Sequence, residues 1–112
     1  KMQGKTEETA SKIIEEAKLA EKLGCVAIVL ECIPCGLAEK ITESVKIPTI
    51  GIGAGAKTDG QVLVLQDMLG MSGFHPRFVR QYLNGAELIE NALNSYAKDV
   101  AEQNFPGPEE SK

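Results

Sequence analysis

The chain has 112 residues, a length that suits one domain, and its 43% hydrophobic residues are enough for an ordinary folded core. A net charge of −4 argues against nucleic acid or an anionic membrane surface as the main partner. No segment approaches the ~18 consecutive apolar residues of a membrane span, so we expect a soluble protein without a membrane partner.

The first part of the chain is predicted to contain a helix followed by a buried strand. The opening Lys1-Met2-Gln3-Gly4 has neither a Met at position 1 nor the apolar region of a signal peptide, so we expect a processed chain or a fragment. Residues 7–23 are predicted to be helical because apolar residues recur at helical spacing and Gly24 follows as a natural stop. The continuous apolar run over residues 25–30 is typical of a strand in a parallel sheet that helices cover.

A second helix and a second strand are predicted next. A short helix over residues 36–44 follows Pro34, and residues 47–52 form a second buried strand. Pro48 lies at the start of that strand, where a missing backbone N–H is tolerated.

The rest of the chain is predicted to be mostly helical. A Gly-rich loop over residues 53–60 leads to residues 62–65, which we predict as a third strand. A parallel crossover usually takes a dozen or more residues, and this connection is shorter. Either the connection contains a single helical turn, or residues 61–69 are themselves helical. Residues 76–83 and 86–103 are predicted to form two further helices.

The order of these elements predicts α/β architecture. Three strands leave two open, apolar edges, which is a liability for an isolated domain, and a complete (βα)8 barrel takes about 250 residues. We therefore expect about three βα units plus C-terminal helices from the last part of a TIM-type barrel. Residues 1–104 would be a segment of a single barrel domain, and residues 105–112 an extended or disordered tail.

Glu31 is the strongest candidate for a catalytic residue. It directly follows the first apolar run, at the carboxyl end of a predicted parallel strand, where the functional groups of an α/β barrel collect. A carboxylate that is partly withdrawn from water can exchange protons near neutral pH. The alternative is a rim glutamate paired with Lys or Arg.

The Gly-rich segment over residues 51–55 has two interpretations. Glycines allow the backbone to approach a ligand closely, and late loops of barrels often bind phosphate. The segment lacks the G-x-G-x-x-G spacing of a dinucleotide site. We favour a tight turn beneath the substrate over an anion site.

The cysteines predict reduced thiols in a cytoplasmic protein. Cys25, Cys32 and Cys35 are an odd number and lie in or beside apolar runs. The last two have the C-x-x-C spacing of a redox or metal pair, but the chain has no second cysteine pair and a single histidine, His75, far along the chain. We expect buried or rim thiols, and a loop or helix-start role for the histidine.

Several motifs together resemble those of one enzyme family, ketopantoate hydroxymethyltransferases. The matching stretches are Val29-Leu30-Glu31-Cys32-Ile33-Pro34, Ile47-Pro48-Thr49-Ile50-Gly51-Ile52-Gly53-Ala54-Gly55, and Thr58-Asp59-Gly60-Gln61-Val62-Leu63-Val64 with Asp67. The opening Met2-Gln3-Gly4-Lys5 and the ending Phe105-Pro106 also look like the family, so the resemblance covers nearly the whole chain.

The resemblance implies a (βα)8 barrel of the phosphoenolpyruvate/pyruvate type, with this chain as its C-terminal portion. It also implies an enzyme of pantothenate synthesis that transfers a one-carbon unit from 5,10-methylenetetrahydrofolate to 3-methyl-2-oxobutanoate, giving 2-dehydropantoate. Magnesium binds the keto acid in this family and stabilises its enolate. The family's catalytic base matches Glu31, which would remove a proton from C3 of the keto acid.

Other functional parts of the family's pattern lie upstream of Lys1. These are the acidic metal ligands and the substrate-binding Ser and Lys, so we assign no metal ligand and no substrate-binding residue within the chain, and neither role to Asp59 or Asp67. We expect the chain alone to be inactive, and the family's homo-oligomers to use residues 86–103 as contact surface. Cys35 departs from the family, which generally has another residue there.

Two other interpretations stay open. The chain is a structural or assembly fragment in the first, left by proteolysis or partial synthesis. It is a phosphate-binding α/β module in the second, using residues 51–55 and the loop that follows.

Overall fold

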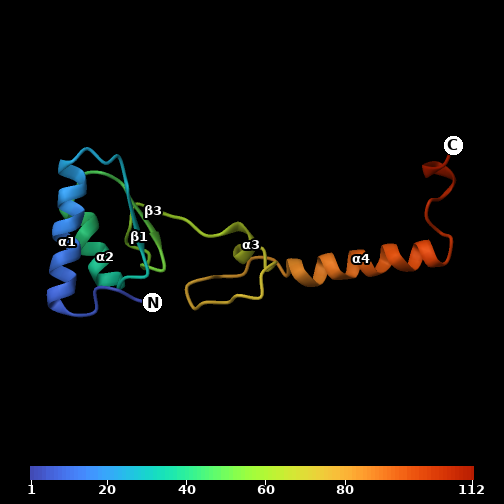
Figure 1. The fold of residues 1–112 in the computed structure, drawn as a ribbon, viewed down its shortest axis with the longest axis horizontal. Helices are drawn as coiled ribbons and strands as arrows, with labels where there is room; N and C mark the ends of the chain where they lie inside the picture. The colour runs from blue at the N-terminus through green and yellow to red at the C-terminus, as the bar shows by residue number, and fades with distance from the viewer. The chain divides into compact units, whose positions relative to one another are not determined.

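The structure is a computed structural model that describes all residues from Lys1 to Lys112. The chain forms two compact units, Lys1–Leu63 and Val64–Lys112. The first unit contains a sheet with two helices, and the second contains helical segments joined by loops (Figure 1).

The first unit is a small α/β structure, as the sequence predicts. Its elements are α1 (Glu7–Lys22), β1 (Ile28–Glu31), α2 (Cys35–Ser44), β2 (Thr49–Ile52) and β3 (Gly60–Gln61). The strands are parallel and lie in the order β1-β2-β3, so β1 and β3 are its two open edges. The mixed α/β class and the parallel sheet are therefore confirmed.

The register of the sheet aligns the carboxyl ends of the first two strands. Ile28 lies opposite Thr49 at the start of the pair, and Glu31 lies opposite Ile52 at its end. The first strand begins later than predicted because pairing starts with the hydrogen bond from the Ile28 N–H to the Pro48 carbonyl, 2.9 Å. The Cys25 N–H instead donates to the Ala20 carbonyl of α1, 3.0 Å, which keeps this residue out of the strand.

The hydrophobic core lies between the sheet and its two helices. Figure 1 shows α1 and α2 on the same side of the strands. Leu30 of β1 is 5% exposed and packs with α2, whose Ala38 and Ile41 are completely buried. The remaining members of the core are Ala17, Ile33, Leu37, Val45 and Ala54.

Hydrogen bonds fix both ends of α1, through a local pair at its start and through long-range bonds near its end. Thr6 caps the helix through a reciprocal pair of bonds with Thr9, since each threonine hydroxyl accepts the other residue's backbone N–H at 3.1 Å. Near the other end, the Glu21 carboxylate accepts the N–H groups of Lys46 and Ile47, the latter at 3.0 Å. This side chain ties α1 to the loop that precedes β2.

The second unit contains the short helix α3 (Leu65–Met68), the long helix α4 (Gly85–Ala101) and a 3₁₀ turn, η1 (Pro108–Glu110). The ring of Tyr96 meets the ring of Phe105 edge to face, with the centroids 5.5 Å apart. The end of the chain, expected as an extended or disordered tail, therefore contains one helical turn and an aromatic contact with α4.

Two predicted elements are wrong. Residues 62–65 do not form a strand, because pairing with β2 ends at the bond from the Val62 N–H to the Gly51 carbonyl, 3.0 Å. The chain then turns, and Val64 is the N-cap of α3, so the alternative of a helix over residues 61–69 is confirmed only for Leu65–Met68.

The predicted helix over residues 76–83 is absent as well. Its segment, with Phe78, Val79 and Tyr82, is rich in aromatic and β-branched residues, which are weak helix formers. The Tyr82 N–H donates to the Met68 carbonyl of α3, 2.7 Å, and this bond replaces one that a helix would have made within the segment.

No helix in the structure combines the length and the apolar character that crossing a membrane requires.

Candidate functional site

The candidate catalytic residue, Glu31, is the last residue of β1 and lies at the carboxyl edge of the sheet. Successive side chains of a strand point to opposite faces. Because Leu30 is buried against the helices, Glu31 points to the face that α1 and α2 leave uncovered. Its side chain is exposed and forms neither an ion pair nor a hydrogen bond within the chain. The structure thus contains no Lys or Arg partner of the kind that the alternative interpretation requires.

The uncovered face of the sheet is apolar apart from this carboxylate. Val29 shares the face with Glu31 and is 62% exposed, and the register places Ile50 and Ile52 beside them. Parallel sheets are normally covered on both faces. A carboxylate at the rim of this face would therefore lie in an apolar, water-poor environment once the face is covered.

The backbone turns sharply directly after the candidate base. Cys32 has a φ of 52°, in the left-handed region that residues other than glycine rarely adopt. Its N–H donates to the Ile52 carbonyl, 3.0 Å, and its own carbonyl accepts the Gln3 N–H, 2.8 Å. Both backbone groups of the turn are therefore satisfied by segments distant in sequence.

The Gly-rich loop after β2 packs against the start of α2. Gly55 has a φ of +81°, and a Cβ added there would overlap the Cβ of Cys35 and lie 3.1 Å from its Cα. The Gly55 carbonyl accepts the Gln61 side-chain amide, 2.8 Å. These contacts support the interpretation of the loop as a tight turn, and the phosphate-binding alternative stays a prediction.

The Asp59 side chain belongs to a hydrogen-bond network that stabilises the fold. Its carboxylate accepts the Thr49 N–H, 2.9 Å, and the Thr49 hydroxyl, 3.3 Å. The same hydroxyl lies 2.8 Å from that of Thr42 on α2, and Thr49 is completely buried. The network joins α2, β2 and the loop before β3.

The residues of this chain do not fit a magnesium site by themselves. No group of three or more His, Cys, Asp or Glu side chains is placed to hold a metal ion. Asp59 is occupied by Thr49, and Asp67 of α3 accepts a hydrogen bond from the Ser72 hydroxyl, 2.6 Å. We therefore derive no chemical step through a metal from these residues.

The cysteines are free thiols. Cys32 is half-buried, whereas Cys25 and Cys35 are exposed, the latter as the first residue of α2. His75 lies in the second unit, in a loop before Pro76. The prediction of unpaired thiols and of a loop histidine is therefore confirmed. The expectation of a buried or rim thiol is wrong for Cys25, which is exposed and precedes the amino end of β1.

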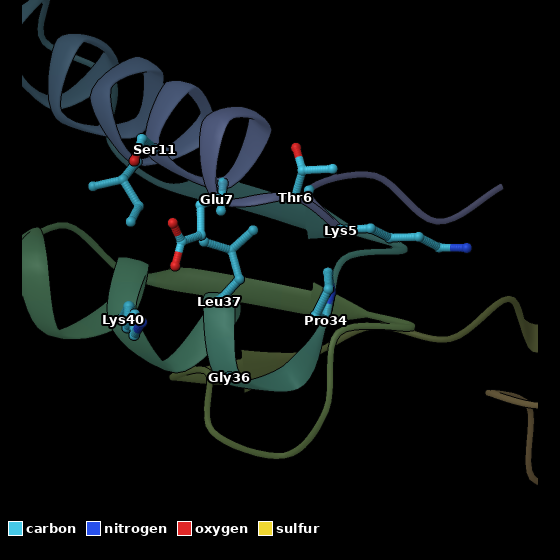
Figure 2. A pocket seen from close by; sticks show the side chains of 11 residues that line it. Lys5, Thr6, Glu7, Ser11, Pro34, Gly36, Leu37 and Lys40 are labelled. Atoms are coloured by element: carbon cyan, nitrogen blue, oxygen red, sulfur yellow. The ribbon is translucent and has the colours of Figure 1, made fainter.

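A groove of about 500 Å³ lies between the N-terminal ends of α1 and α2. Figure 2 shows Glu7, the first residue of α1, pointing toward Leu37 and Lys40 of α2 across this groove. Glu31 does not line it, because the groove is on the helix side of the sheet and the candidate base points to the other side. The groove and the candidate catalytic site are thus separate features.

Sequence reasoning missed the support of the turn after Glu31. Nothing in the sequence signals a left-handed residue at Cys32, because the usual markers of that conformation are Gly, Asn and Asp. The bond from the Gln3 N–H is also invisible in sequence, since a backbone donor leaves no side-chain pattern.

Comparison with known proteins gives a consistent result. The chain matches the family described as "Ketopantoate hydroxymethyltransferase" over residues 1–108. It is 56% identical over 110 residues to a 3-methyl-2-oxobutanoate hydroxymethyltransferase from Francisella tularensis. The aligned residues cover 97% of this chain and 42% of the relative. A relative of the same name from Heliobacterium modesticaldum is 54% identical over 112 residues, which are 99% of this chain and 41% of the relative. Another from Clostridium novyi is 56% identical over 110 residues, which are 97% of this chain and 40% of the relative.

The match falls in the C-terminal part of these proteins, so the chain spans about two fifths of the length of the curated relatives. Its motifs, its parallel sheet and its similarity over almost every residue agree with one another. The chain belongs to the ketopantoate hydroxymethyltransferase family.

Proposed function

We propose that the full-length protein carrying residues 1–112 is a 3-methyl-2-oxobutanoate hydroxymethyltransferase of pantothenate synthesis. It would transfer a hydroxymethyl group from 5,10-methylenetetrahydrofolate to 3-methyl-2-oxobutanoate and release 2-dehydropantoate. Its similarity to relatives with this name supports the reaction. The observation that carries the proposal is the position of Glu31, an unpaired carboxylate at the carboxyl edge of a parallel sheet.

Glu31 is the general base in this proposal. Its carboxylate accepts the proton from C3 of the keto acid, and the electron pair of the broken C–H bond moves into the enolate. The enolate carbon then attacks the one-carbon unit and forms the new C–C bond while the two bonds from that unit to the folate nitrogens break. Water supplies the hydroxyl group, and tetrahydrofolate leaves with one proton from C3 and one from water on its nitrogens. A positioned base contributes about 10²–10⁴-fold to such a step. In this proposal the magnesium ligands come from the part of the full-length protein outside residues 1–112, and the step assigned to Glu31 does not use them.

The uncovered sheet face supports a barrel as the setting of this site. Val29 and its neighbours Ile50 and Ile52 would face the interior of a (βα)8 barrel of the phosphoenolpyruvate/pyruvate type, with the rest of the full-length protein closing it. We place residues 1–104 in that single domain. The protein would be cytoplasmic, in keeping with its free thiols.

The homo-oligomer expected through the C-terminal helices is also a proposal. It would use the apolar residues of α4, which are exposed: Leu88, Ile89, Leu93, Tyr96 and Val100.

The test is product formation by a full-length enzyme that contains this segment. The assay uses either the natural full-length polypeptide or a hybrid protein in which the Francisella relative supplies the residues outside this segment. We expect Glu31→Gln to abolish formation of 2-dehydropantoate, whereas Glu39→Gln, an exposed glutamate on α2, should leave it unchanged. The 112-residue chain alone should form no product. Normal turnover by the Glu31→Gln enzyme would refute the role of Glu31.

A further inference from the structure

We propose that Cys32 is a positioning residue for the candidate base, and that it acts through its left-handed backbone rather than through its thiol. The inference rests on the proposed role of Glu31. It concerns the single residue that separates the end of β1 from the segment leading into α2.

The first observation is the conformation itself. Cys32 and Gln103 are the only residues other than glycine with a positive φ, and Cys32 immediately follows the candidate base. Residues held in this region are strained and persist only where the surrounding structure fixes them, and such residues concentrate at functional sites. The strand therefore ends at Glu31 through a conformation that most side chains disfavour.

The second observation is that two separate segments hold the turn. The Cys32 N–H continues the ladder with β2 by donating to the Ile52 carbonyl at 3.0 Å. On the other side of the residue, its carbonyl accepts the Gln3 N–H at 2.8 Å. The backbone that follows Glu31 is thus fixed both to the neighbouring strand and to the segment before α1.

The packing around Gln3 supports the same conclusion. A Cβ added at the next residue, Gly4, would lie 2.5 Å from Cδ2 of Leu37 and 3.1 Å from Cδ1 of Ile13. The segment before α1 is therefore pressed against both helices and cannot move freely away from Cys32. Ile33, the residue after the turn, is 5% exposed and belongs to the core.

The consequence concerns the direction of the Glu31 side chain. Paired backbone groups at Ile28 and at Cys32 bracket β1 and keep the alternation of its side chains in place up to its last residue. If the turn at Cys32 opened, the strand end would lose the bond to Ile52, and Glu31 would no longer be fixed on the uncovered face. Proton transfer would suffer more than substrate binding.

The test compares variants of Cys32 in the full-length enzyme. Cys32→Gly and Cys32→Asn tolerate the left-handed region, Cys32→Ser keeps the size without the thiol, and Cys32→Val strongly disfavours a positive φ. Steady-state kinetics should give kcat within about threefold of wild type for Gly, Asn and Ser. Cys32→Val should lose about tenfold or more in kcat, with KM for the keto acid changed less than about threefold.

A second pair of variants addresses the hydrogen bond independently. Gln3→Pro removes the N–H that bonds the Cys32 carbonyl, whereas Gln3→Ala keeps it. We expect kcat to fall in the first variant and to remain normal in the second, and this pair decides the question if Cys32→Val does not fold.

Two outcomes would overturn the inference. Loss of activity in the Gly, Asn and Ser variants alike would assign the role to the thiol, and wild-type kcat in both Cys32→Val and Gln3→Pro would remove any positioning role. Glu31→Gln is measured in parallel. If that variant stays fully active, the proposed function itself fails. If it is inactive while the Cys32→Val and Gln3→Pro enzymes are both unaffected, only the positioning role is refuted.

Discussion

Replacing Gly55 by Ala tests whether the Gly-rich loop needs a residue without a side chain in order to pack against the start of α2. The new Cβ would overlap that of Cys35 and lie 3.1 Å from its Cα, and neither atom can move without shifting the start of α2. A φ of +81° adds backbone strain. Left-handed strain costs about 1–2 kcal/mol for a residue with a side chain, and overpacking costs about 1–3 kcal/mol. We expect Gly55→Ala to lower the free energy of unfolding by at least about 2 kcal/mol.

Two other glycines separate these contributions. Gly24 has a φ of +94° and no atom within 4 Å of an added Cβ, so Gly24→Ala should show the backbone strain alone, about 1–2 kcal/mol. Gly36 lies in α2 with open space and no positive φ, so Gly36→Ala should be neutral or stabilise by up to about 1 kcal/mol. The predicted order of stability is Gly36→Ala, then Gly24→Ala, then Gly55→Ala.

Thermal denaturation of the full-length enzyme measures the series. The Gly55→Ala enzyme should melt about 4 °C or more below wild type. Removing the opposing Cβ in a Gly55→Ala/Cys35→Gly double variant should recover about 1 kcal/mol, as a double-mutant cycle measures it. A Gly55→Ala enzyme as stable as Gly24→Ala, without coupling to position 35, would refute the packing argument.

Two further predictions concern the framework beneath the site. Thr49→Val should destabilise the full-length enzyme by about 1–3 kcal/mol in the same melting assay, because it removes a buried hydroxyl that bonds both Asp59 and Thr42; an unchanged melting temperature would contradict this. Glu21→Ala should also cost about 1–3 kcal/mol, since it leaves two backbone N–H groups before β2 without their acceptor. The exposed Glu16→Ala on the same helix is its control, and equal losses in the two variants would argue against the role of Glu21.

The sequence predicts four elements of the first unit, α1, β1, α2 and β2, because each carries an apolar pattern. It misses β3, whose residues Gly60 and Gln61 carry no such pattern. The apolar runs before Glu31 and Gly53 mark β1 and β2. Ile28 and Leu30 pack against the helices, whereas Val29, Ile50 and Ile52 lie on the face that α1 and α2 leave uncovered. The regular spacing of apolar residues marks α1 and α2. The first apolar run places Glu31 directly after the strand. In the structure β1 extends one residue further and ends at Glu31.

The parts that the sequence does not predict depend on tertiary hydrogen bonds. The segment around Tyr82 has apolar residues at helical spacing. The Tyr82 N–H nevertheless donates to the Met68 carbonyl of α3, a partner that no local pattern indicates. The left-handed turn at Cys32 depends on the carbonyl of Ile52 and the N–H of Gln3, both distant in sequence. Local propensity is overridden in both places by partners that only the folded chain brings together.

Exchange of the C3 proton of 3-methyl-2-oxobutanoate in D₂O, without the folate, tests the central claim most directly. Proton NMR follows the exchange, which isolates proton removal from the later transfer step. The Glu31→Gln full-length enzyme should exchange the proton about 10²–10⁴-fold more slowly than wild type, while Glu39→Gln should exchange it normally. Exchange at the wild-type rate in the Glu31→Gln enzyme would contradict the assignment of Glu31 as the base.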